Sequence, residues 1–84
     1  MIKIIEYLQE EMNKDKERSV RYFAFDELKD VANVLYKKNK PIDEMYKYLI
    51  QEIDKTKDNN SNRINQMRYL ALKEIYHKCK VLEN

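Results

Sequence analysis

The chain has 84 residues and a formal charge of +2, from 17 basic and 15 acidic side chains, so its charge demands neither a nucleic acid nor a membrane surface. A hydrophobic share of 43% suits one core, but a chain of this length has little room for an enclosed substrate cavity. It contains no glycine, which phosphate-binding loops, nucleophile elbows and dinucleotide-binding turns require for positive φ or close backbone approach. This composition predicts one domain, residues 1–84, made of helices joined by polar loops.

The first predicted helix covers residues 2–14. Ile4, Leu8 and Met12 recur at the spacing of a single buried helical face. The polar stretch that follows, up to Ser19, loses this pattern and predicts a loop.

The second helix has an ambiguous beginning. Residues 20–25 hold aromatic and β-branched side chains, which fit either an extended segment or an early helical start. From Asp26 the helical pattern is clear, and the predicted helix covers 26–38. Its apolar face includes Leu28 and Leu35.

Pro41 marks the start of a third helix, predicted over 41–55, because proline suits the first helical position, where its missing N–H has no intrahelical partner. Met45, Leu49 and Ile53 form its apolar face. The polar run after it predicts a loop.

In that loop we expect Asn60 or Ser61 to cap a fourth helix, predicted over 62–82. The side chains expected to face the core are Ile64, Met67, Ala71, Ile75 and Leu82, with Leu72 and Cys79 widening the face. Four amphipathic helices (about 2–14, 26–38, 41–55 and 62–82) predict an all-α, small single-domain bundle.

The sequence offers no convergent set of catalytic or metal-binding residues. The single histidine, His77, lies two positions from the single cysteine, Cys79, which puts the two on different helix faces. A zinc site needs more ligands of these types, and the polar loop lacks the glycine and the terminal glutamate of a calcium loop. We therefore expect no enzyme activity, catalytic residue, metal, cofactor or small-molecule substrate.

One line of side chains on the fourth helix is a candidate contact surface. Tyr69, Lys73, Tyr76 and Lys80 lie at i, i+4, i+7 and i+11, with Gln66 and His77 alongside. Tyrosine is favoured at interfaces because it offers a large area, few rotatable bonds and a polar tip. The plainer alternative is that these rings pack sideways on a neighbouring helix with their hydroxyls in water.

The expected function is a non-enzymatic protein–protein interaction module that uses this line of residues. Its small size and its many residues with AT-rich codons favour a phage- or plasmid-encoded modulator from a low-GC bacterial setting. An inhibitor of a host protein such as a bacterial defence component is one form of this hypothesis. The absence of a run of about 20 apolar residues predicts a cytoplasmic protein with no membrane partner.

Two alternatives stay open. The first is a small DNA- or RNA-binding regulator, because residues 55–80 are the most basic part of the chain. Its candidate contacts are Lys55, Lys57, Arg63, Arg68, Lys73 and Lys80. The second is a structural homodimer whose interface is the face of Tyr69 and Tyr76.

Overall fold

In the computed structural model, which describes residues 1–58 and 62–83, all regular structure in these ranges is α-helical. The helices are α1 (Ile2–Lys14), α2 (Val20–Lys37), α3 (Ile42–Asp58) and α4 (Arg63–Glu83). The predicted all-α bundle is confirmed.

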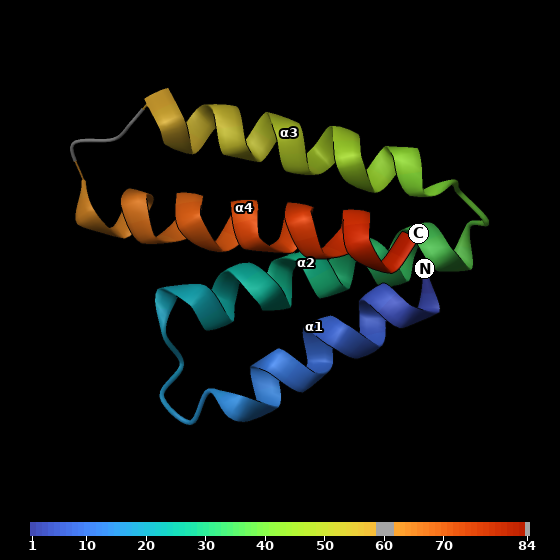
Figure 1. Cartoon of the computed structure of the whole chain (residues 1–84), viewed down its shortest axis with the longest axis horizontal. Coiled ribbons are helices and arrows are strands. Elements are labelled where there is room, and N and C mark those ends of the chain that lie inside the picture. Colours follow the sequence, from blue (N-terminus) through green and yellow to red (C-terminus); the bar gives the residue numbers. More distant parts are fainter. Residues whose placement is uncertain (59–61, 84) are drawn as a thin grey trace.

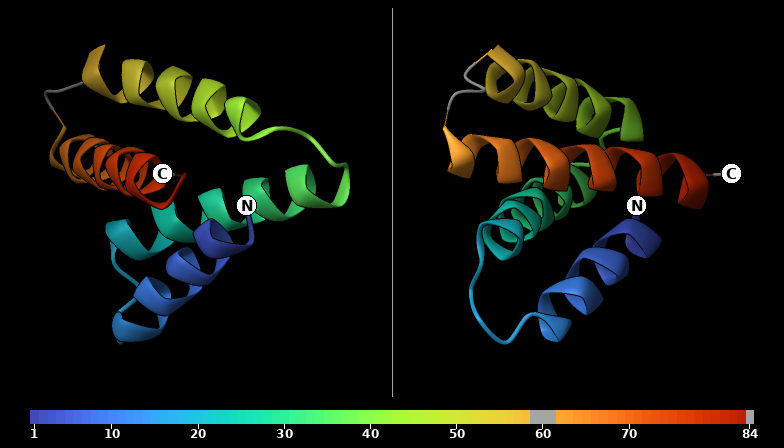
Figure 2. Two further views of the ribbon diagram at one scale, coloured as in Figure 1. Left: turned by 45° about the vertical axis from the view of Figure 1, so that its right-hand side comes forward. Right: turned by 60° about the vertical axis from the view of Figure 1, so that its left-hand side comes forward.

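The helices α2 and α4 cross at the middle of the bundle, and each carries one further helix on its outer side (Figure 1). Helix α1 packs on α2, and α3 packs on α4, so that α1 and α3 lie on opposite sides. Helices α1 and α4 approach each other where the two ends of the chain lie and diverge from there (Figure 2). Helix α4 therefore contacts three other helices but is not surrounded by them.

All four helices contribute to one core. Its centre is formed by α2 and α4, whose Phe25, Leu28, Leu72 and Ile75 are completely buried. The other fully buried large side chains are Ile4, Leu8, Met45, Leu49 and Cys79. Most of these residues belong to the predicted apolar faces, because burial of such faces drives helix packing.

The segment 20–25 is helical and forms the first turns of α2. Ser19 caps this helix, since its hydroxyl oxygen accepts a hydrogen bond of 3.0 Å from the Tyr22 N–H. The Ser19 hydroxyl in turn donates to Asp15, in the turn between α1 and α2. This cap and the burial of Phe25 outweigh the preference of aromatic and β-branched residues for extended structure.

A chain without glycine must end α2 by other means. Asn39 takes a positive φ of 55°, and the next N–H, that of Lys40, donates to the Leu35 carbonyl. Asparagine is the non-glycine residue that tolerates this left-handed conformation best. Pro41 then precedes α3, which begins one residue later than predicted and extends beyond the predicted end to Asp58.

The core face of α4 differs from the prediction. Ala71, Leu72, Ile75 and Cys79 are buried, but Ile64 is 59% exposed, so its assignment to the core was wrong, as was that of Met67. The first turns of α4 extend beyond the start of α2 (Figures 1 and 2), so α2 does not cover them.

The N-terminus of α4 is capped within the described part of the chain. The Asn62 side-chain oxygen accepts a hydrogen bond of 2.9 Å from the Ile64 N–H. The predicted caps, Asn60 and Ser61, lie outside the described residues.

Candidate interaction surface on α3 and α4

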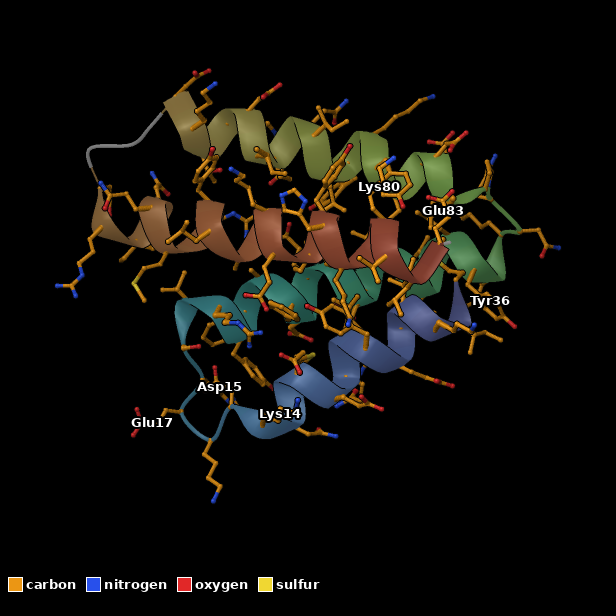
Figure 3. All side chains as sticks on the ribbon, viewed as in Figure 1. Lys14, Asp15, Glu17, Tyr36, Lys80 and Glu83 are labelled. Atoms are coloured by element: carbon orange, nitrogen blue, oxygen red, sulfur yellow. The ribbon has the colours of Figure 1, made fainter. Side chains whose placement is uncertain are left out.

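The predicted line of tyrosines and lysines lies on the side of α4 next to α3. Tyr69 and Tyr76 are partly buried, whereas Lys73 and Lys80 are exposed. Figure 3 shows Lys80 on the last turns of α4, directed toward α3. The partial burial of both rings agrees with sideways packing on a neighbouring helix, and the reading as a contact surface stays a prediction.

The C-terminal end of this surface is a cluster of edge-to-face aromatic rings and charged groups. The Tyr46 and Tyr76 rings meet edge-on, with centroids 5.5 Å apart, and the Lys80 ammonium lies 4.2 Å from the Tyr46 centroid. The Tyr46 hydroxyl donates a hydrogen bond of 2.6 Å to the Glu83 carboxylate. Burial, strengthened by this carboxylate, raises the pKa of Tyr46 above its usual value of 10.0.

The middle of the surface is more open. The Lys73 ammonium lies 5.3 Å from the centroid of the Tyr69 ring, and the exposed His77 ring lies 6.0 Å from that of Tyr76. Gln66 is exposed at the N-terminal end of the line. Each ring is thus held by a neighbour on its own helix or on α3.

A groove between α3 and α4 brings three of the predicted residues together. Its volume is about 250 Å³, and it is lined by Ile50, Ile53, Asp54, Lys73, Tyr76 and His77. Its lining is largely apolar, and it also includes the exposed, oppositely charged side chains of Asp54 and Lys73. The sequence reasoning missed the contribution of α3, although Ile50 stands beside the apolar face of its helix. At 47% exposure Ile50 is an accessible apolar contact.

The predicted nucleic-acid contacts do not share one environment. The Arg68 side chain is half-buried, and its guanidinium lies 2.9 Å from carboxylate oxygens of both Glu27 and Glu52. Lys55 also pairs with Glu52, at 3.1 Å. Lys73 and Lys80 lie over tyrosine rings, and Lys57 and Arg63 are exposed. These six residues therefore do not form one uninterrupted basic face.

The single cysteine of the chain, Cys79, belongs to the core and does not line the groove. Cys79 is completely buried, and burial raises the pKa of its thiol to about 11, so it stays protonated at neutral pH. Within residues 1–58 and 62–83, no group of three or more His, Cys, Asp or Glu side chains is placed to hold a metal ion.

Over the same ranges, none of the helices combines the length and the apolar character needed to cross a membrane. Comparisons of the chain with family models, curated proteins and solved structures find no match. The functional interpretation therefore rests on the residues of the groove themselves.

Proposed function

We propose that this protein is a non-enzymatic protein-interaction module and that its partner binds at the α3–α4 groove. The observation that carries the proposal is the groove itself. It combines an accessible isoleucine, a tyrosine edge and two opposite charges in a hollow of about 250 Å³. Interfaces are typically anchored by one or two large side chains seated in such hollows.

The chemistry of the groove indicates what it accepts. A hollow of this size takes one large apolar side chain against Ile50 and Ile53. Lys73 can then bind a carboxylate of the partner, and Asp54 can bind a basic group. The partner's surface is therefore expected to present an apolar anchor flanked by charges of both signs.

The tyrosine rings around the groove are already ordered. Tyr76 packs on Tyr46, and Lys80 covers both rings, with its ammonium 5.6 Å from the Tyr76 centroid. Binding therefore costs little side-chain entropy on this face, which favours affinity. The more specific form of the proposal, a mobile-element product that modulates or inhibits a host protein, rests on size and composition.

Crosslinking from the groove tests this proposal. A photoreactive amino acid at His77 should crosslink a partner from a low-GC bacterial extract, whereas the same group at Lys16, in the turn between α1 and α2, should not. The Ile50→Asp substitution should abolish that crosslink, and the matched Val34→Asp substitution, at an exposed site on α2, should leave it intact. Identical products from both positions, or an unchanged product with Ile50→Asp, would refute the proposal.

A nucleic-acid partner would give a different result. Duplex DNA would bind with an affinity that falls steeply as salt rises, because phosphate contacts release counterions. Charge reversal at Lys73 and Lys80 would then remove most of that binding. A salt dependence near zero would exclude the nucleic-acid reading.

A further inference from the structure

A second surface of α4 is apolar and uncovered. Met67 and Leu70 are 42% and 65% exposed, on a face of the helix that neither α2 nor α3 covers. Leu70 and Tyr76 are six residues apart and point about 120° from each other around the helix. This surface is therefore separate from the α3–α4 groove.

The residues of this face follow a heptad spacing. Arg63, Met67, Leu70 and Glu74 stand at i, i+4, i+7 and i+11, the alternation of four and three residues found along the contact line of a coiled coil. We call these four residues the α4 seam. The order of their side chains is basic, apolar, apolar, acidic.

A hollow lies directly on the seam. It has a volume of about 200 Å³ and is lined by Met67, Leu70, Ala71 and Glu74 of α4 together with Arg21 of α2. The four α4 residues stand at i, i+3, i+4 and i+7, the arrangement that forms the hole for a side chain of a facing helix in coiled-coil packing. The seam therefore has both the spacing and the shape of a helix-docking surface.

We infer that the α4 seam binds the α4 seam of a second copy of this chain, with the two helices antiparallel. When two copies of the seam run in opposite directions, each basic residue faces an acidic one and each apolar residue faces an apolar one. With the twofold axis between positions 68 and 69, Met67 of each copy lies opposite Leu70 of the other. Arg63 of each copy then lies opposite Glu74 of the other. The seam therefore matches the seam of a second copy of the same chain.

The Glu74 carboxylate is oriented and accessible for an ion pair with Arg63 of the second copy. Its carboxylate is held 2.5 Å from the Arg21 guanidinium, yet its side chain is still 46% exposed. A carboxylate has about four acceptor positions, so it can accept from Arg63 of the second copy while Arg21 fixes its orientation. Arg63 is exposed and forms no ion pair with the described residues.

The size of the seam sets the strength of the dimer. Twelve residues of helix span about 18 Å, and such a contact is smaller than the roughly 800 Å² per partner of a standard stable interface. The dimer is therefore weak, with a dissociation constant on the order of 10–1000 µM, and the protein is a monomer in dilute solution.

Sedimentation velocity over a wide concentration range tests this inference. The unmodified protein should pass from monomer to dimer as its concentration rises. Leu70→Asp should raise the dissociation constant by more than about tenfold, since each dimer loses two apolar contacts. Arg63→Glu should also raise it, because it replaces both ion pairs by repulsion. The control Val34→Asp should not. A protein that stays monomeric at millimolar concentration, or a dimer that tolerates Leu70→Asp, overturns the inference.

Disulfide formation tests the direction of pairing. Chains with Met67→Cys, mixed with chains with Leu70→Cys, should form the mixed disulfide faster than either variant alone forms its own. The native Cys79 is buried and does not compete. Faster pairing of each variant with itself would indicate a parallel arrangement and would refute the antiparallel register.

Discussion

Replacement of Arg68 by methionine tests how much the ion pairs of this residue stabilise the packing of α2, α3 and α4. The Arg68 guanidinium, on α4, lies 2.9 Å from Glu27 on α2 and 2.9 Å from Glu52 on α3. Tyr48 of α3 donates a further hydrogen bond of 2.5 Å to Glu27. Arg68→Met retains most of the side-chain volume but removes the cation that Glu27 and Glu52 share, so Glu52 keeps only its pair with Lys55 and Glu27 keeps the hydrogen bond from Tyr48.

The magnitude of the loss follows from the exposure of these groups. The side chains of Arg68, Glu27 and Glu52 are 22%, 36% and 17% exposed, so each ion pair lies between the surface and the buried limit. Surface pairs contribute about 0–1 kcal/mol, and loss of one partner of a fully buried pair costs about 3–5 kcal/mol. We expect Arg68→Met to lower the free energy of unfolding by about 2 kcal/mol at pH 7.

The loss of unfolding free energy caused by Arg68→Met should be smaller at acidic pH. Burial raises the pKa of Glu27, but the hydrogen bonds from Arg68 and Tyr48 outweigh burial and hold that pKa below its usual value of 4.5. A carboxyl whose pKa is lowered by folding stabilises the fold above pH 4.5. That contribution disappears as the pH falls through the folded pKa. The difference between wild type and Arg68→Met should therefore narrow below pH 4.5.

Urea unfolding followed by circular dichroism at pH 7 and at about pH 3.5 measures both effects. Arg63→Met, at an exposed arginine of the same helix, is the matched control and should stay within about 0.5 kcal/mol of wild type. A loss at Arg68 no larger than at Arg63, or a loss that is the same at both pH values, would refute the reasoning.

Two further predictions concern the cap of α2 and the buried tyrosines. Ser19→Ala should cost about 1 kcal/mol and lower the midpoint of thermal unfolding by about 4–8 °C, because the Tyr22 N–H loses its acceptor; an unchanged midpoint would contradict the cap. Burial raises the pKa values of Tyr7, Tyr46 and Tyr48 above 10.0, so stability is lost as the pH rises above that value. Absorbance at alkaline pH should show these three ionising together with unfolding; titration of all seven tyrosines near pH 10 with unchanged circular dichroism would contradict this.

The predicted fold was confirmed because most apolar residues of α1 and α3 repeat on one face of each helix. Ile4, Leu8 and Met12 are all buried, as their spacing indicates. The start of α2 could not be predicted in this way. Val20 and Phe23 fit a strand as well as a helix, and the deciding contacts are the Ser19 cap and the burial of Phe25.

The error in α4 has a geometric cause. Periodicity identifies the residues that share a face, but it does not say how far along the helix a neighbour covers that face. Ala71 and Ile75 are buried, whereas Ile64, in the first turn of α4, is 59% exposed, and Figure 1 shows the first turns of α4 extending beyond the start of α2. In addition, Met67 and Leu70 form a second apolar face, which a search for one face assigns in part to the core.

Only the α4 side of the groove could be predicted from the sequence. The spacing of Lys73 and Tyr76 follows from one helix, and the structure brings both to the hollow. Ile50 and Asp54 come from α3, and their approach depends on which helices pack together, which no local pattern in either segment specifies. Sites formed by residues of two helices are therefore the hardest part of a helical bundle to predict from a single sequence.

The two proposed surfaces have a joint consequence. The α4 seam and the α3–α4 groove occupy different faces of the same helix, so a dimer formed through the seam leaves both grooves accessible. Such a dimer is bivalent toward a partner that is itself a dimer or is clustered. The second binding event then becomes intramolecular, and the overall affinity can exceed that of one groove by a factor of about 10²–10⁴. If the proposed dimer forms, binding to such a partner should therefore depend steeply on the concentration of this protein.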